Sequence, residues 1–443
     1  MTAQSSQGRV AAPILLAYAL PGLPLAALQL PLFVYIPAFY AQDLGLGLAA
    51  VGMVLLLARL WDMATDPLIG LLSDRTRWAV GRRKAWMLLG TPLLLVAAWF
   101  LLAPGPQAGL SHLLLWTFAI TLGGTMVLVP YQAWGAELSA DYHERSRIAG
   151  AREGLVVLGV LAATGLPPLL ASDLAGSMRL LAWGLIFSLP LCVGICIVRV
   201  PDRKRGAEPA LPLRAGLKIM LENAPFRRLL SAYLLNGIAN GLPATLFVFF
   251  LVHVLRLDFE TWAGPLLFVY FLSAICAVPC WLALARRIGK AQAWMLAMAM
   301  ASLCFLPVPL LGEGDRWIFL GVCMLTGFAL GAELALPPSI QADVVDLDRL
   351  RSGQERTGQF FALWGMATKL ALALAAGIAL PVLQLFGFDP SAAPGASGGL
   401  LVLALLYAGL PIVLKLTAMS LLHGFPITAE SQARLRERLE TTA

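Results

Sequence analysis

The stretch Arg59–Trp86, RLWDMATDPLIGLLSDRTRWAVGRRKAW, decides the fold class of this chain. It begins inside a long apolar run, yet that run carries two carboxylates, Asp62 and Asp66, one helical turn apart. The run then gives way to a cluster of basic residues. Acids in this setting raise the question of what surrounds the run.

The composition of the whole chain answers that question. Hydrophobic residues make up 59% of the 443 residues and charged residues 13%, whereas soluble domains carry about 25% charged residues. The mean hydropathy is +0.79. Apolar runs of about 20 residues, the length that crosses a bilayer as a helix, recur along the chain. We therefore expect the lipid bilayer, and no nucleic acid, to be the chain's large-scale partner despite the net charge of +7.

The apolar runs predict about twelve membrane-spanning helices, so the expected fold class is an all-α integral membrane protein. A polar stretch from Val200 to Arg228 divides the runs six and six. This predicts an N-terminal six-helix bundle at 1–200, a cytoplasmic linker at 201–225, a C-terminal six-helix bundle at 226–422 and a cytoplasmic tail at 423–443. Two such bundles suit alternating access around a site near the membrane midplane. The runs lie near residues 12–40, 47–72, 85–103, 112–139, 149–171, 179–200, 226–256, 262–286, 292–311, 315–340, 358–386 and 398–422.

Lysine and arginine concentrate in every second connection between the runs, and the connections between these hold few cations. The positive-inside rule therefore predicts that both termini and the basic connections are cytoplasmic, in a cytoplasmic (inner) membrane of bacterial type. The basic clusters lie at 75–84, 145–147, 203–214, 286–290, 349–356 and 434–438.

Asp62 and Asp66 are the strongest candidates for chemistry. A charge at the centre of a membrane helix costs about 2.5 to 3.5 kcal/mol on insertion scales, so it persists mostly where it faces a cavity or a partner. The spacing puts both carboxylates on one helix face, with Arg59 on the adjoining turn. Na⁺ held by oxygen ligands, or a proton on one carboxyl, would relieve the repulsion between them. The structural alternative is that Asp66 caps a helix broken at Pro67 or pairs with Arg59, while Asp62 hydrogen-bonds across helices.

Three stretches carry a resemblance to a known family. GLLSDRTRWAVGRRK, at 70–84, resembles the loop signature of the major facilitator superfamily. Together with RLWDMATDPLIG (59–70), VPYQAWGAELSADYHERSRIAGAREG (129–154) and LPPSIQADVVDLDRLRSGQERTGQFFALWGMATK (336–369), it resembles the glycoside-pentoside-hexuronide:cation symporters over nearly the whole chain. That branch contains the melibiose permease and, more distantly, the animal sodium-dependent lysophosphatidylcholine symporters. The resemblance implies the major facilitator fold and cation-coupled solute import.

The resemblance also implies roles for individual positions. Asp62 and Asp66 match the helix-II pair to which the family's coupling cation is assigned, so they are the expected metal ligands if the cation is Na⁺. Lys369 matches a lysine near the cation and substrate sites. Either Arg152 or its neighbour Glu153 matches the helix-V arginine of the sugar permeases. Loop and gate charges implied by the signature and its flank are Arg59, Asp74, Arg82 and Arg83.

Several sugar-binding side chains of the melibiose permease are missing from this chain. Its helix-I aspartate falls on Ala26, its helix-IV aspartate on Leu128 and its stacking tryptophan on Gln132. These losses weaken a galactoside assignment, because a site that reads hydroxyls needs buried acceptors and an aromatic face. A sugar or glycoside remains the expected solute. The alternative is an amphipathic anion, such as a lysophospholipid, whose headgroup meets Lys369.

Other polar and aromatic side chains in the apolar runs are candidates for lining a cavity, with interhelical hydrogen bonding as the structural alternative. Glu333 ranks first, because an acid there needs a partner or a proton, and Lys369 is its expected electrostatic counterpart. Charges after the fourth and tenth runs predict either a salt-bridge gate or solvated loop ends. The cavity candidates are Tyr131, Gln132, Asn236, Asn240, Glu333 and Trp364, and the gate candidates are Asp141, Arg145, Asp343 and Arg349.

The sequence thus predicts a monomeric secondary symporter driven by Na⁺ or H⁺, with no cofactor beyond that ion. A non-transporting assembly or sensor protein on the same scaffold is an alternative, against which the retention of both acids and Lys369 argues. We expect no enzymatic activity, because the chain has no nucleophile elbow, metal-ligand helix or phosphate loop.

Overall fold

The computed structural model describes residues 10–76, 78–105, 107–139, 142–171, 173–201, 223–352, 357–391 and 398–426. Every regular element in these ranges is a helix, and twelve of the helical stretches are long and apolar enough to cross a membrane. The prediction of an all-α membrane fold with about twelve spans is confirmed.

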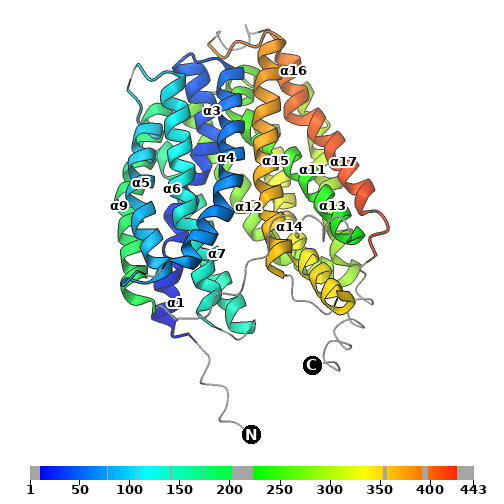
Figure 1. Ribbon diagram of the computed structural model, residues 1–443. Coiled ribbons are helices and arrows are strands. Elements are labelled where there is room, and N and C mark those ends of the chain that lie inside the picture. The colour runs from blue at the N-terminus through cyan, green and yellow to red at the C-terminus, as the bar shows by residue number, and fades with distance from the viewer. Residues whose placement is uncertain are drawn as a thin grey trace. The chain divides into compact units, whose positions relative to one another are not determined.

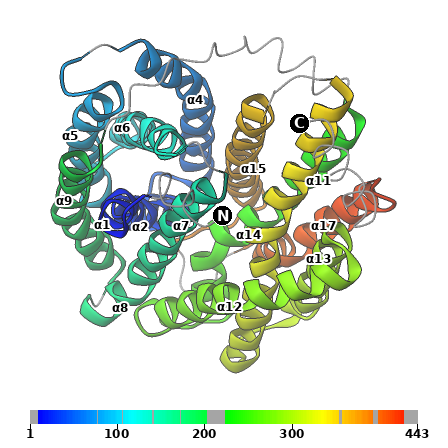
Figure 2. The same ribbon diagram turned by 90° about the horizontal axis from the view of Figure 1, so that it is seen from below.

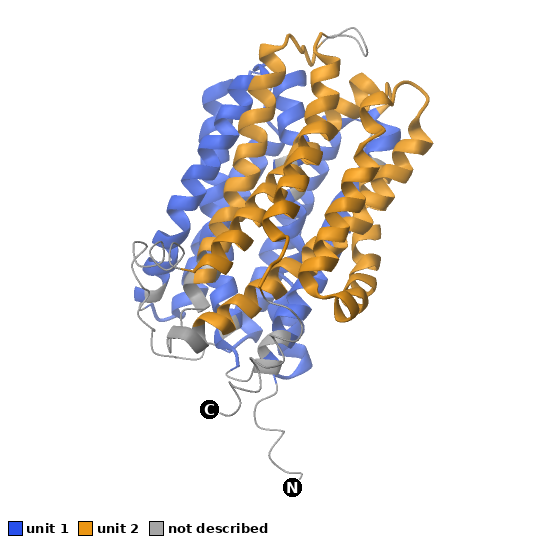
Figure 3. Ribbon diagram, turned by 90° about the vertical axis from the view of Figure 1, so that its right-hand side faces the viewer, with its two compact units in different colours: residues 1–209, 259–264 blue, residues 210–258, 265–443 orange. Residues whose placement is uncertain are grey.

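The chain forms two compact units, coloured separately in Figure 3. Unit 1 comprises residues 1–209 together with 259–264, and unit 2 comprises 210–258 together with 265–443. The main break falls inside the polar stretch that separates the sixth and seventh apolar runs.

The helices of unit 1 pack as a bundle in which α4 lies on α6, α6 on α5, and α5 on α9 (Figures 1 and 2). The N-terminal helices α1 and α2 pack against α7 and α9. The helices and their bounds are α1 (Ala12–Ala19), α2 (Gly22–Leu30), α3 (Ile36–Ala38), α4 (Leu48–Arg75), α5 (Arg82–Leu102), α6 (Leu110–Glu137), α7 (Tyr142–Gly165), α8 (Pro167–Leu170) and α9 (Leu174–Arg199), with π-helical turns η1 (Pro31–Tyr35) and η2 (Phe39–Asp43).

The first apolar run differs from the single helix predicted at 12–40. It is divided into α1, α2, α3 and two π-helical turns. Prolines recur in it at positions 21, 24, 31 and 37, and each removes a backbone donor and crowds the preceding turn. The run is therefore an irregular helical stretch made of short segments.

Glycines set the closest helix contacts in both units. A Cβ on Gly90 of α5 would lie 2.7 Å from the Cβ of Met126 on α6. In unit 2 a Cβ on Gly241 would lie 2.7 Å from that of Ala375. Small residues allow membrane helices to approach closely, which compensates for the absence of a hydrophobic driving force between helices in lipid.

Unit 2 is built around α11, which packs against α15 and α17, while α13 packs against α14 and α17. Its core is mainly alanine and large aromatic side chains, among them Trp281, Trp294 and Phe360. The helices are α11 (Ala224–Phe249), α12 (Phe259–Ile288, whose first six residues belong to unit 1), α13 (Lys290–Phe305), α14 (Arg316–Ser352), α15 (Thr357–Leu385), α16 (Leu400–Ala404) and α17 (Leu410–Leu422), with short helical turns η3 (Phe250–Val254), η4 (Val308–Leu310) and η5 (Leu405–Gly409).

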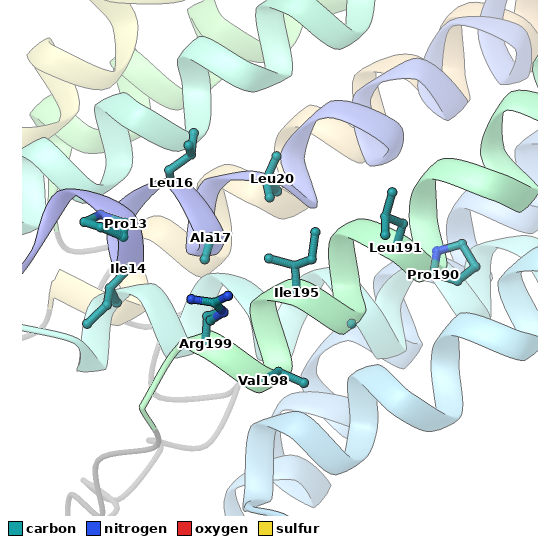
Figure 4. A pocket seen from close by; sticks show the side chains of 11 residues that line it. Pro13, Ile14, Leu16, Ala17, Leu20, Pro190, Leu191, Ile195, Val198 and Arg199 are labelled. Atoms are coloured by element: carbon teal, nitrogen blue, oxygen red, sulfur yellow. The ribbon is translucent and has the colours of Figure 1, made fainter.

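An apolar groove of about 730 Å³ lies between α1 and α9 in unit 1. Figure 4 shows Ile14 and Ala17 on one side, Ile195 on the other, and the Arg199 side chain directed toward α1. None of the predicted site residues lines this groove.

Candidate cation site and buried charge clusters

The two acids of the opening stretch meet a hydroxyl from a neighbouring helix. Asp62 and Asp66 lie on α4, and the Thr125 side chain reaches them from α6. The Thr125 Oγ1 lies 2.9 Å from Asp62 Oδ1 and 2.9 Å from Asp66 Oδ1. Asp62 and Thr125 are buried, at 5% and 4% exposure. The structure therefore gathers three oxygen atoms, from two helices, at one point in unit 1.

These contacts favour a positive charge or a second proton at this point. A threonine hydroxyl has one proton, so it donates one full hydrogen bond at a time. Two ionised carboxylate oxygens that converge on it leave one short oxygen–oxygen contact with no proton between the atoms. Protonation of one carboxyl, or a cation among the three oxygens, removes that conflict.

The donor set fits a hard cation. Carboxylate and hydroxyl oxygens are the ligands that Na⁺, like Ca²⁺ and Mg²⁺, accepts in proteins. In the described part of the chain no three His, Cys, Asp or Glu side chains gather as they would around a transition metal. Asp62, Asp66 and Thr125 are the residues that would hold Na⁺, and the same carboxylates would accept H⁺.

Arg59 contributes a positive charge beside the acids. Its Nη1 lies 3.5 Å from Asp62 Oδ2, which is a long ion pair. One part of the structural alternative, in which Asp66 caps a helix broken at Pro67, is wrong because α4 runs without interruption from Leu48 to Arg75. Another part, in which Asp62 hydrogen-bonds across helices, is confirmed by the Thr125 contact. Pro67 is accommodated inside the helix, where it leaves the carbonyl of Met63 without its usual donor.

A second buried charge cluster lies in unit 2. Lys415 of α17 is 1% exposed. Its Nζ donates to Asn236 Oδ1 at 2.8 Å, to Asn240 Oδ1 at 2.7 Å and to Glu333 Oε1 at 3.0 Å. The Asn240 amide in turn donates to Glu333 Oε2. Each proton of the ammonium thus has an acceptor, and both carboxylate oxygens accept.

This cluster corrects the predicted pairing of Glu333 with Lys369. The ion-pair partner of Glu333 in the structure is Lys415, from a helix 82 residues further along the chain. Lys369 lies half-buried on α15. Lys415 was not among the predicted residues, although the rule that singled out the acids, a charge inside an apolar run, applies to it equally.

Two predicted cavity residues are engaged in packing and hydrogen bonds within their units. Tyr131 is fully buried in unit 1, and its hydroxyl donates to the Tyr18 carbonyl at 2.8 Å. Trp364, 7% exposed, stacks on Tyr233 in unit 2 with ring centroids 3.8 Å apart. These contacts supply the structural roles that were the alternatives to substrate binding.

Of the remaining candidates in unit 1, Gln132 is exposed on α6. Arg152 is half-buried on α7, and its Nε donates to Glu153 Oε1 at 3.2 Å. Arg152 also lies close enough to interact electrostatically with Tyr18 and Tyr131. Arg152, rather than the exposed Glu153, therefore turns toward the interior of unit 1.

Two of the predicted loop charges form a compact ion-pair group. Arg82 and Arg83 begin α5, directly after Gly81, whose φ is 109°. Both contact Glu137 Oε1 at the end of α6, at 2.8 Å. Arg83 Nη1 also donates to Ser73 Oγ at 2.7 Å. We call this group the α5–α6 latch; Glu137, its central acid, was not among the predicted residues.

Unit 2 contains a matching group. Lys290 begins α13 directly after Gly289, whose φ is 94°, and its Nζ lies 2.6 Å from Asp343 Oδ2 on α14. We call this pair the α13–α14 latch. The same kind of ion-pair latch thus joins the third span to the fourth and the ninth span to the tenth.

Four predicted gate and loop residues cannot be placed in contacts. Asp141 lies outside the described residues, as do the side chains of Asp74, Arg145 and Arg349. The predicted gate between the two halves therefore stays a prediction.

Comparison with known proteins places the chain in a family. The model of the family described as "MFS/sugar transport protein" matches residues 17–429. The chain is 26% identical over 434 residues to the mouse sodium-dependent lysophosphatidylcholine symporter 1, with 88% of this chain and 80% of the relative covered. It is 25% identical over 402 residues to the putative glycoside/cation symporter YagG of Escherichia coli, with 88% and 86% covered.

Solved structures agree in fold. The nucleoside transporter NupG superimposes with a TM-score of 0.64 at 16% identity, over 93% of this chain and 99% of that one. A bacterial homologue of the human lysosomal transporter Spinster gives a TM-score of 0.66 at 13% identity, over 96% and 97% of the two chains. With the family model matching nearly every span, and relatives covered over most of their length, this chain belongs to the MFS/sugar transport protein family of the major facilitator superfamily.

Proposed function

We propose that this protein is a secondary symporter, without enzymatic activity, that couples solute import to Na⁺ or H⁺ through Asp62, Asp66 and Thr125. The observation that carries the proposal is the convergence of two carboxylate oxygens on one hydroxyl, each at 2.9 Å. Symport is also in the names of the mouse and Escherichia coli relatives.

The coupling follows from the charge at the site. Asp62 and Asp66 carry two negative charges when ionised and Arg59 carries one positive charge, so the three groups sum to −1. One bound monovalent cation neutralises them. In the proposed cycle this charge balance permits reorientation only when cation and solute are both bound or both absent, so that neither crosses the membrane alone. Solute that binds only to the cation-loaded state then moves with the cation.

The solute we propose is an amphipathic anion rather than a sugar, and the contacts of four predicted cavity residues support this choice. A sugar site needs free hydrogen-bonding side chains and an aromatic face. Tyr131 donates its hydroxyl to the backbone, Asn236 and Asn240 accept from Lys415, and the Trp364 ring stacks on Tyr233. A lysophospholipid needs fewer hydrogen-bonding side chains and aromatic rings, because its tail requires only apolar contact. A glycoside is the competing outcome of the experiment below.

The orientation we propose has both termini and the basic connections on the cytoplasmic side of a bacterial-type inner membrane. The two latches lie at the ends of the spans that carry the basic clusters, which the positive-inside rule assigns to the cytoplasm. This orientation can be tested by introducing a Cys residue beside Arg82, or beside Lys290, and labelling it in intact cells. Both should react only after the membrane is permeabilised.

The experiment for coupling measures the thermal midpoint of purified protein in detergent against Na⁺, Li⁺ and pH. It is repeated with sugars, glycosides and lysophospholipids, and with Asp62→Asn. The control variant is Glu260→Gln, which neutralises an exposed acid in the first turn of α12. We expect the wild type and the control to respond to the cation and Asp62→Asn not to respond.

The solute class that enlarges the cation response identifies the cargo. A response to lysophospholipid but not to glycoside supports the amphipathic solute, and the reverse result replaces it with a sugar. If neither salt nor pH acts through Asp62, the acids are structural and the proposed coupling is wrong.

A further inference from the structure

We propose that Lys415 is a tethered cation. Its ammonium group fills, in unit 2, a site of the kind that unit 1 offers to the coupling ion, so that the protein binds one mobile cation per chain and carries a second positive charge covalently. This inference rests on the proposed function for unit 1 and adds to it the number of ions that the protein takes up.

The coordination of Lys415 is that of a bound cation. Three oxygen atoms surround its nitrogen: the side-chain carbonyls of Asn236 and Asn240, and a carboxylate oxygen of Glu333. They come from two helices, α11 and α14, while the lysine enters from a third, α17. An amide–amide–carboxylate shell is an oxygen ligand set that hard cations accept.

The charge of the cluster is already balanced. Glu333 contributes −1 and Lys415 +1, and the ion pair is 3.0 Å long with the lysine and glutamate side chains 2% and 7% exposed. In unit 1 the formal charges of Asp62, Asp66 and Arg59 sum to −1. In the proposed function a mobile ion balances this charge. The two sites are therefore alike in ligand chemistry and opposite in their need for an ion from solution.

The size of the shell indicates which free cations could replace the ammonium. The nitrogen–oxygen distances of 2.7 to 3.0 Å exceed the roughly 2.3 to 2.6 Å of Ca²⁺–oxygen bonds. Without the lysine side chain, a large monovalent cation such as NH₄⁺ or K⁺ should fit the three oxygens with little rearrangement, and Na⁺ should fit with more.

The experiment removes the tether and offers free cations. Lys415→Ala is combined with Asp62→Asn, which eliminates the unit 1 response, and the thermal midpoint is titrated with NH₄⁺, K⁺ and Na⁺. We expect a saturable stabilisation, strongest with NH₄⁺ or K⁺, that Asp62→Asn alone lacks. The control Lys415→Ala/Glu333→Gln with Asp62→Asn, which takes the charge from the shell, should lose it.

Failure to fold also gives an answer. If Lys415→Ala is recovered only when one of these cations is present during purification, the tethered-cation assignment is supported. If the neutral double variant Lys415→Ala/Glu333→Gln folds and no cation rescues Lys415→Ala, then Lys415 is only a structural ion-pair partner and the proposal is overturned.

The wild type provides an independent count. Equilibrium binding of radioactive Na⁺ should give no more than one site per chain, and two sites would overturn the inference. A wild type that shows no cation response through Asp62 defeats the proposed function of unit 1. It does not affect the titration of the Lys415 variants, which is carried out without that site.

Discussion

At the scale of single residues, the position of each charge reflects what a bilayer tolerates. Asp62, Glu333 and Lys415 lie inside apolar spans, and each has a polar partner from another helix. Such partners make an intramembrane charge tolerable, and a charge at this depth is a candidate functional site. The residue that completes the proposed cation site in unit 1, Thr125, carries no charge at all.

The first prediction concerns Thr125. Thr125→Ala removes the hydroxyl that joins the two carboxylates, and we expect cation affinity to fall by at least the roughly 10- to 100-fold that follows the loss of a group supporting a metal site. Cation titration of the thermal midpoint measures the change. Thr125→Ser retains the hydroxyl and should bind within a few-fold of the wild type. Equal loss in both variants would mean that packing, not the hydroxyl, matters.

The sequence predicted the acids but could not predict this threonine. Threonines in membrane helices commonly bond to the carbonyl four residues earlier, as Thr117 does to Leu113 and Thr326 does to Val322. Thr125 follows the same local pattern in sequence and differs only because α4 places two carboxylates beside it. The packing of α4 against α6 determines which groups Thr125 contacts. The residue pattern within one span does not reveal that packing.

The case of Lys415 is different, because the sequence did contain the signal. A lysine in the apolar run VLKLTAM is as costly as an acid there. What the sequence could not supply was the partner. Lys369 is nearer to Glu333 along the chain, but the arrangement of α14 and α17 selects Lys415.

At the scale of helices, small residues and ion pairs hold neighbours together. The predicted spans agree closely with the helices where the pattern is regular, for example 112–139 against Leu110–Glu137. They fail in the first run, where prolines divide the helix. The length of an apolar run predicts that the chain crosses the membrane. It does not predict where the helix is interrupted.

The second prediction concerns the packing of α11 on α15. Gly241→Ala places a methyl group 2.7 Å from the Cβ of Ala375, so the helices must separate. We expect a loss of about 1 to 3 kcal/mol in stability. The matched control is Gly184→Ala on α9, where nothing lies within 4 Å of the new Cβ and a small gain is expected. Unfolding in denaturant compares them, and an equal effect at both sites contradicts the packing argument.

The third prediction concerns the α5–α6 latch. Glu137→Gln leaves Arg82 and Arg83 without their shared carboxylate in a setting where the three side chains are only 7 to 16% exposed. Breaking a buried pair on one side costs about 3 kcal/mol or more. We expect a lower thermal midpoint that Glu137→Asp partly restores. Full stability in Glu137→Gln would show that solvent already screens these charges.

At the scale of the whole molecule, the charge balance decides the electrical behaviour of transport. In our proposal one mobile cation is taken up per cycle and Lys415 stays with the protein. If the solute has no net charge, each cycle then moves one positive charge inward. The membrane potential contributes about 2.3 kcal/mol per charge per 100 mV, so it should drive the uptake of an uncharged solute.

The fourth prediction tests this in proteoliposomes. With the solute identified by the stability panel, a zwitterionic or neutral cargo should enter faster when a potassium diffusion potential makes the interior negative. An anionic cargo with charge −1 should be insensitive to the potential, because the cation cancels its charge. Asp62→Asn should show no gradient-driven uptake in either case, and potential-driven uptake by that variant would contradict the coupling site.

The two latches have a consequence for how the molecule was assembled. Each one is completed within its own unit, and each begins with a glycine of positive φ before a basic residue, although the participants differ: two arginines and a glutamate in one, a lysine and an aspartate in the other. Two versions of one arrangement within a single chain are what duplicated modules that diverge under a shared geometric constraint would show. Each unit therefore contains a complete latch of its own. If the chain is divided between residues 209 and 223 and produced as two polypeptides, both latches should still form.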